Sequence, residues 1–263
     1  MIIIVSAVFT NSIIIFSDIN NRQSISLWIL NISAAVASSL GIIAIYRYGV
    51  QGTHGRSYLF LTLGLLTWFS ADAAELYYYV VEGHEEQKLV SISDWLWFAG
   101  YGFLSAHLFT VISSIHSYIR RRVILMVSVI SVLFVVYNIH LLLSSSGEYF
   151  SVGEDNIDSI ALLVTVAYPI LDLILIVPSG IILISLRKDY QHSIPWVLTS
   201  LSLLINAIAD DGYVHDFVNG NLQSLWFWNM FYVTDFIIMA GALFWYNRFH
   251  ISSELSRKNT INL

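Results

Sequence analysis

Several ionisable side chains lie within or at the edge of long apolar runs of this chain, where each is energetically costly and marks a candidate functional residue. They are Asp72, Glu75, Asp94, His107, Asp172, Asp210, Asp211, His215 and Asp235. Carboxyl and imidazole groups at such positions can bind a ligand, transfer a proton or join helices through hydrogen bonds. The spacing of Asp72 and Glu75, and of Asp211 and His215, places each pair on one helix face. We therefore predict that these residues form a ligand-binding site.

The acids of this predicted site have no basic partner in the apolar runs, because every lysine and arginine lies outside them. Their charge can be accommodated by a water-filled cavity, by protonation or by a bound cation. Alternatively, the acids accept hydrogen bonds from neighbouring helices, for which Ser70, Tyr101, Asn206 and Tyr232 are suitable donors. The number of acids and histidines on neighbouring helices favours a polar pocket open to the outside over such bonds alone.

A metal site is a weaker interpretation of the same residues. Asp72, His107, Asp211 and His215 carry chemically suitable ligand atoms for Zn²⁺. The chain nevertheless has neither a His-x-x-x-His nor a His-Glu-x-x-His spacing. We therefore predict no metal site and leave any cofactor unknown.

The amino-acid composition indicates which kind of protein positions these groups. Of 263 residues, 57% are apolar and 11% charged, with a mean hydropathy of +0.70, whereas a soluble domain carries about 25% charged residues. A net charge of −6 gives no basic surface for nucleic acid, and the absence of cysteine excludes disulfides and thiolate chemistry. We predict a single polytopic membrane domain over residues 1–263, with membrane lipids as partners and no nucleic acid.

Apolar runs of about 20 residues, the length that crosses the hydrocarbon core as a helix, occur seven times. They are Leu27–Tyr46, Tyr58–Val81, Asp94–Tyr118, Val123–Leu143, Ser159–Leu186, Trp196–Val218 and Leu225–Tyr246. An eighth run, Ile2–Phe16, is about 22 Å long as a helix. It is either a retained short helix, which we favour, or a signal peptide. The predicted fold class is all-α transmembrane, with seven long helices plus a short N-terminal helix.

The basic residues predict the orientation of these helices. Ten of the twelve lysines and arginines fall on one side of the membrane: Arg47, Arg56, Arg120, Arg121, Arg122, Arg187, Lys188, Arg248, Arg257 and Lys258. Only Arg22 and Lys88 fall on the other side, whose loops are acidic. Because basic loops stay inside, we predict a multi-pass protein of the cell membrane with a cytoplasmic C-terminus.

Two parts of the chain share a short pattern, which consists of an Ala-Asp pair, a glycine and then Trp-x-Trp-x-x-x-Tyr. The first copy runs from Ala71-Asp72 to Tyr101 and the second from Ala209-Asp210 to Tyr232. Each copy belongs to a half of three helices, residues 27–118 and 159–246, and residues 123–143 form a linking helix. This plan predicts a three-plus-one-plus-three parallel repeat, related by an axis along the membrane normal, with the site between the halves.

Some of these motifs resemble the multi-pass N-terminal membrane modules of bacterial sensor proteins that end in GGDEF and EAL domains. The residues concerned are Tyr168-Pro169-x-x-Asp172-Leu173, Ala209-Asp210, Gly220, Leu225-Trp226 with Tyr232, and the run from Asp94 to Tyr101. The resemblance covers roughly residues 58–117 and 160–245, and it implies a membrane-embedded sensory module whose ligand is unassigned. About 17 residues follow Tyr246, with no output domain, so such a sensor needs a separate membrane or signalling partner.

A remoter resemblance is to YhhN-type lysoplasmalogenases, which are multi-pass ether-lipid hydrolases. Ala71-Asp72 and Ala209-Asp210 are similar to the paired Gly-Asp and Ser-Asp elements of that family, and Phe98–His107 is similar to its glycine-rich helix ending in Ala-His. The resemblance implies Asp72, His107 and Asp210 as catalytic acid and base on a vinyl ether. The early Lys-Pro element of the family has no counterpart, since the first lysine here is Lys88.

Three functions remain open from the sequence. We predict first an integral membrane ligand-binding or sensory module, possibly within a larger membrane assembly. The alternatives are an intramembrane lipid hydrolase of the lysoplasmalogenase type and a structural subunit of a membrane complex without a site of its own. Of these, we expect binding without turnover.

Overall fold

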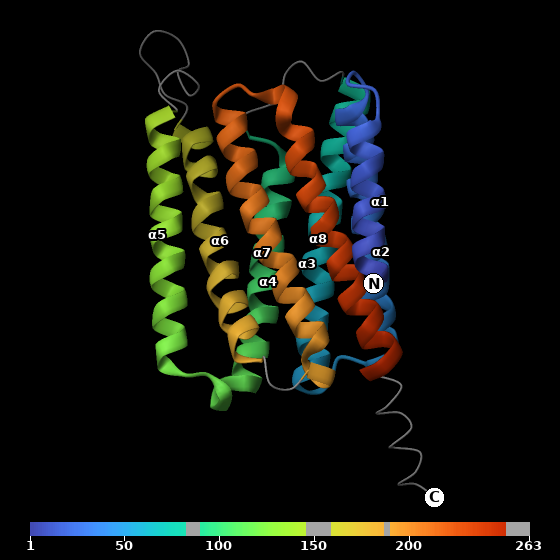
Figure 1. Cartoon of the computed structure of the whole chain (residues 1–263), viewed down its shortest axis with the longest axis vertical. Helices are drawn as coiled ribbons and strands as arrows, with labels where there is room; N and C mark the ends of the chain where they lie inside the picture. The colour runs from blue at the N-terminus through green and yellow to red at the C-terminus, as the bar shows by residue number, and fades with distance from the viewer. Residues whose placement is uncertain (83–89, 146–158, 187–189, 251–263) are drawn as a thin grey trace, which may run out of the picture.

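The computed structural model describes residues 1–82, 90–145, 159–186 and 190–250, and in these residues the chain forms eight α-helices and no strand (Figure 1). The helices are α1 Ile2–Phe16, α2 Arg22–Tyr48, α3 Gly52–Tyr77, α4 Ile92–Ile115, α5 Arg121–Ser145, α6 Ser159–Ser185, α7 Tyr190–Val218 and α8 Leu225–Trp245. Short π-helical turns, Tyr78–Glu82 and Tyr246–His250, extend α3 and α8. The predicted all-α fold is confirmed.

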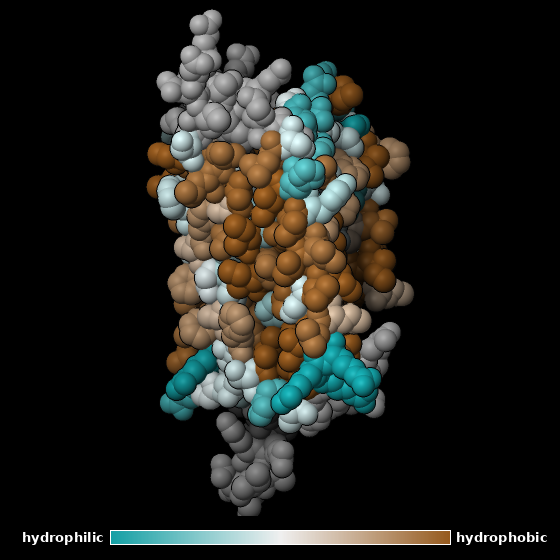
Figure 2. Space-filling view, turned by 90° about the vertical axis from the view of Figure 1, so that its left-hand side faces the viewer, coloured by the Kyte–Doolittle hydropathy of each residue, from teal (hydrophilic) through white to brown (hydrophobic). Residues whose placement is uncertain are grey.

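Seven of the eight helices, α2 to α8, are long and apolar enough to cross a membrane. Figure 2 shows the corresponding surface, on which apolar residues cover the middle of the bundle and hydrophilic residues gather at its two ends. A surface of this kind is stable only against lipid, because water would meet a continuous apolar belt. The chain is therefore an integral membrane protein, as its composition predicts.

Six helices form a ring in the order α2, α3, α4, α6, α7 and α8, with α8 packed against α2. Outside the ring, α5 packs against α6 and α1 packs against α8 and α2, so that α1 and α5 lie at opposite edges of the bundle (Figure 1). This order places α2 to α4 opposite α6 to α8, which is the arrangement expected of two similar halves. The helix predicted as a linker, α5, lies outside this ring.

The short helix α1 is packed into the bundle, although its 15 residues are too few to span the hydrocarbon core. Ile14 is fully buried, Asn11 donates a hydrogen bond of 2.9 Å to Thr234 of α8, and the side chain of Ile3 lies against Gly241. Residues 2–16 thus form the short N-terminal helix that the sequence predicts.

The two ends of the bundle differ in charge. We call the end that carries Arg47, Arg56 and Arg121 the basic end, and the end that carries Asp18 and Glu82 the acidic end. At the acidic end a capping box begins α4, because Ser91 accepts from the backbone of Ser93 while Asp94 accepts from the backbone N–H of Ser91. This cap fixes the position of Asp94.

The predicted orientation can be measured on single-cysteine variants, since the chain contains no cysteine. Asp18→Cys lies in the exposed α1–α2 connection at the acidic end, and Gln51→Cys lies in the exposed α2–α3 connection at the basic end. We expect a membrane-impermeant maleimide to label Asp18→Cys in intact cells, and Gln51→Cys only after lysis. The reverse labelling pattern would overturn the orientation derived from the basic residues.

Candidate functional site

The hydroxyl of Tyr101 on α4 lies between two buried carboxyl groups. It is 2.6 Å from Oδ1 of Asp172 on α6 and 2.5 Å from Oδ2 of Asp210 on α7. The hydroxyl of Tyr232 on α8 donates to the other oxygen of Asp210 at 2.6 Å. We call these four residues the aspartate–tyrosine cluster. It joins α4 of one half to α6, α7 and α8 of the other.

The hydrogen bonds of the cluster require one proton more than its tyrosines provide. A phenol has a single O–H, so Tyr101 donates to only one of its two carboxyl neighbours. The remaining short contact needs a proton on the carboxyl itself. Oδ2 of Asp172, whose side chain is fully buried, has no hydrogen-bond partner in the described structure. The geometry is that of two carboxyl groups that share one phenolic donor.

Three further aspartates surround this cluster. Asp72 on α3 accepts 3.1 Å from the indole N–H of Trp97 on α4, and Asp211 accepts 3.0 Å from Asn138 of α5. Asp235 on α8 accepts from Ser202. All three aspartates are buried. Each of the three therefore accepts a hydrogen bond from a polar side chain on a neighbouring helix.

Asp235 has two hydrogen-bond donors on α7. Besides the hydroxyl of Ser202, the amide of Asn206 donates to it at 3.2 Å. Ser202, Asn206 and Asp210 follow one another at intervals of four residues, so they share one face of α7. Asp210, Asp72 and Asp235 are close enough to interact electrostatically. The predicted convergence of the aspartates is therefore observed.

A second group of polar side chains lies nearer the acidic end. The hydroxyl of Tyr168 on α6 donates 2.6 Å to Asp94, and the hydroxyl of Tyr213 on α7 lies 3.5 Å from Glu75 of α3. Glu75 also interacts electrostatically with Asp94. We call these four residues the outer group. All four are only partly buried, in contrast to Tyr101 and Asp172.

The two predicted histidines lie apart from these acids. His107 is buried on α4, two turns nearer the basic end than Tyr101, and its Nδ1 is 2.8 Å from the hydroxyl of Ser57 on α3. His215 is exposed at the acidic end, and its carbonyl accepts from the side-chain amide of Asn219, which follows α7. His215 shares α7 with Asp211 as predicted, but Asp211 accepts from Asn138 of α5, and no hydrogen bond joins Asp211 to His215 in the described structure.

The described residues contain no group of three or more acidic or histidine side chains arranged to hold a metal ion. The acids accept instead from aromatic hydroxyl and indole groups and, at Asp211 and Asp235, from amide and serine side chains. Tyr101 and Tyr232 were predicted as possible donors from the sequence, whereas Trp97, Tyr168 and Tyr213 were not. The sequence could have indicated that Tyr168 and Tyr213 lie near the acids. Tyr168 precedes Asp172 by four residues and Tyr213 follows Asp210 by three, so each shares a helix face with an aspartate.

Comparison of the chain with protein-family models, with curated proteins and with solved structures found no match. The resemblances to sensor modules and to lysoplasmalogenases accordingly stay predictions from the sequence.

Proposed function

We propose that this chain is an integral membrane ligand-binding module of the sensory kind, and that its ligand is a proton held by the aspartate–tyrosine cluster. The observation that carries the proposal is the position of the Tyr101 hydroxyl, 2.6 Å from Asp172 and 2.5 Å from Asp210. One phenolic proton cannot satisfy both carboxyl groups. The cluster therefore binds an additional proton when it has the observed geometry.

The charges around the cluster support a proton as the bound species. Asp72, Asp211 and Asp235 surround it, whereas the arginines of the described helices lie at the helix ends. An unpaired negative charge inside a membrane protein is costly. Binding one proton removes one such charge and completes a hydrogen bond at the same time, so it stabilises the arrangement in two ways.

The position of the cluster supports a sensory rather than a merely structural role. Its members come from both halves of the ring, α4 on one side and α6, α7 and α8 on the other. Release of the shared proton would leave adjacent carboxylates on α6 and α7, which repel each other. A change in protonation is thereby coupled to the packing of the two halves, and a separate membrane or signalling protein could respond to it.

The hydrolase alternative has less geometric support. Among the described contacts, none joins His107 to Asp72 or Asp210, because the imidazole is bonded to Ser57. A general acid and base must reach the same substrate group within hydrogen-bonding distance. The separation of His107 from the aspartates therefore favours proton binding without turnover.

The proposal can be tested by infrared spectroscopy of the protein in lipid nanodiscs. We expect the wild type to show a carboxylic acid C=O band that shifts in D2O and that is absent from both Asp172→Asn and Asp210→Asn. The amide that replaces either carboxyl supplies the missing N–H donor, so the bonding pattern persists without the added proton. Both variants should therefore fold while losing this band.

Asp18→Asn serves as the matched control, since Asp18 is an exposed acid in the α1–α2 connection. Its spectrum should keep the band. If the band is missing from the wild type, or remains in both cluster variants, the cluster holds no added proton and the proposal fails. Hydrolysis of an ether lysolipid by the purified wild type would favour the lysoplasmalogenase alternative instead.

A further inference from the structure

The four helices of the aspartate–tyrosine cluster carry different kinds of side chain on its two sides, towards the acidic end and towards the basic end. Towards the acidic end, three of them carry an acid or a tyrosine within two turns of the cluster, namely Asp94 on α4, Tyr168 on α6 and Tyr213 on α7, and Glu75 of α3 lies beside Tyr213. These are the residues of the outer group. Proton exchange needs groups of this kind at hydrogen-bonding separations, or water between them.

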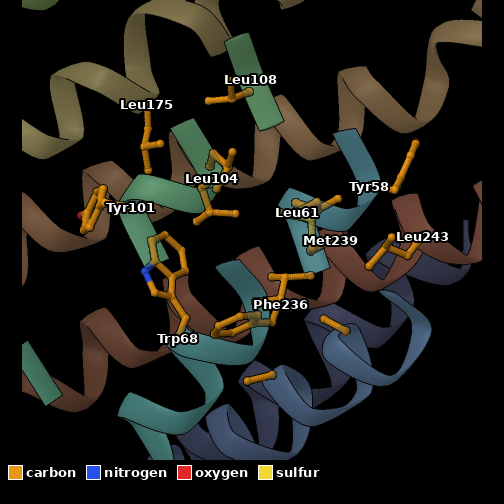
Figure 3. Close-up of a cluster of buried hydrophobic side chains, with 14 of the residues drawn as sticks. Tyr58, Leu61, Trp68, Tyr101, Leu104, Leu108, Leu175, Phe236, Met239 and Leu243 are labelled. Atoms are coloured by element: carbon orange, nitrogen blue, oxygen red, sulfur yellow. The ribbon is translucent and has the colours of Figure 1, made fainter. Parts of the chain in front are cut away.

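Towards the basic end, α4, α6 and α8 carry apolar side chains, while α7 carries Asn206 and Ser202, which donate to Asp235. Leu104 follows Tyr101 by three residues, Leu175 follows Asp172 by three, and Met239 follows Asp235 by four. Their side chains are at most 1% exposed, which leaves no room for water beside them. Figure 3 shows Leu104, Leu175 and Met239 in one continuous apolar cluster with Leu61 and Leu108.

Aromatic rings close the bundle further towards the basic end. Tyr58 of α3 and Tyr246, which follows α8, stack with ring centroids 3.7 Å apart and are at most 2% exposed. His107 lies within this half, but it is 1% exposed and bonded to Ser57. Leu104 separates it along α4 from Tyr101. The described residues thus give the cluster the outer group on one side and the apolar side chains of α4, α6 and α8 on the other.

We propose that the cluster exchanges its proton with the acidic end only, through Glu75, so that the protein reports the pH on that side and does not conduct protons. Glu75 accepts a proton from water at the acidic end and becomes a neutral acid. It returns to a carboxylate when the proton passes to Asp210, through the hydroxyl of Tyr213 or an intervening water. The groups that face Glu75 are Asp72 on its own helix, Asp94 on α4, Tyr168 on α6 and Tyr213 on α7. This inference rests on the proposed function.

The test uses the full chain in phosphatidylcholine vesicles, oriented by capture on a C-terminal tag and loaded with a pH-sensitive dye. We expect an external pH step to change the carboxylic acid band of the cluster in vesicles with the acidic end outside. With the basic end outside, the band should change only as fast as the internal dye. The membrane side from which the cluster responds is measured on the wild type alone, so the result does not depend on how a variant folds.

Two variants test the route. Glu75→Gln should slow the response by about 10²-fold, a typical contribution of one positioned acid–base group, while Asp18→Asn should respond like the wild type. A response from the basic end, from neither end, or at an unchanged rate in Glu75→Gln would overturn the inference. The nanodisc spectra described under the proposed function distinguish failure of proton binding from failure of this inference. A missing cluster band refutes proton binding itself. A band that is present but responds to pH on the basic side refutes only the route through Glu75.

Discussion

Tyr101→Phe should lower the stability of the bundle strongly, because it removes the one hydroxyl that contacts both Asp172 and Asp210. A buried polar group left without its hydrogen-bond partner costs about 1–3 kcal/mol. Asp172 has no other side-chain donor in the described structure, whereas Asp210 keeps the bond from Tyr232. We therefore expect a loss of about 2–4 kcal/mol, measured as a decrease in the midpoint of thermal or denaturant unfolding in detergent.

Two matched variants make this expectation specific. Tyr232→Phe removes a single bond to Asp210 and should cost about 1 kcal/mol. Tyr137→Phe removes a hydroxyl from an exposed side chain of α5 and should be close to neutral. The predicted order of destabilisation is therefore Tyr101, Tyr232, Tyr137. Equal effects of the first and third changes would show that the Tyr101 bonds contribute nothing to stability.

The helices were readily predicted, because the bilayer imposes a length and an apolar composition that are visible in the sequence. The ends of the helices were harder to place. The run predicted from Tyr58 begins at Gly52 in α3, and the run predicted from Leu27 begins at Arg22 in α2. Arg22 and Arg56 lie near the starts of these two helices. The polar turns of a membrane helix lie beyond the hydrocarbon core, so an apolar run in the sequence is shorter than the helix itself.

The site was predicted only in part. Charge in an apolar run is a strong signal, so the aspartates of α3, α6, α7 and α8 were identified, and the structure brings them together. The donors were less visible, because tyrosine and tryptophan also occur at membrane interfaces as simple anchors. Trp97 entered the sequence analysis as part of the repeated pattern rather than as a donor, yet its indole donates to Asp72. His215 was included for its spacing from Asp211, and His107 for its place in an apolar run and in a resembling motif, but their hydrogen bonds are made away from the aspartates.

The two halves use similar motifs for different bonds. Tyr101 and Tyr232 occupy equivalent places in the repeated pattern, but both contact Asp210, whereas Asp72 bonds to Trp97. The cluster is therefore asymmetric, with both tyrosines bonded to Asp210 of α7. A short sequence pattern could not predict this asymmetry, because the asymmetry depends on which half supplies Asp172.

Gly100→Ala should destabilise the bundle, because the backbone of α4 passes directly beside Trp68 of α3. A Cβ at Gly100 would lie 2.1 Å from Cδ1 and 2.4 Å from Nε1 of that indole. Trp68 is buried, donates to the carbonyl of Trp97 at 3.1 Å and packs edge-on against Tyr101. Moving it breaks the bond and disturbs the ring that positions the cluster. Overpacking of this kind typically costs about 1–3 kcal/mol.

The control for this substitution lies two residues further along the same helix. A Cβ at Gly102 meets no atom within 4 Å, so Gly102→Ala should be neutral or slightly stabilising, as alanine favours a helix over glycine. Trp68→Phe in the Gly100→Ala background should restore part of the lost stability, because the smaller ring leaves space for the methyl group. Unfolding midpoints of the four proteins measure both effects. If Gly100→Ala and Gly102→Ala unfold alike, the close approach of α3 and α4 at the cluster does not constrain the fold.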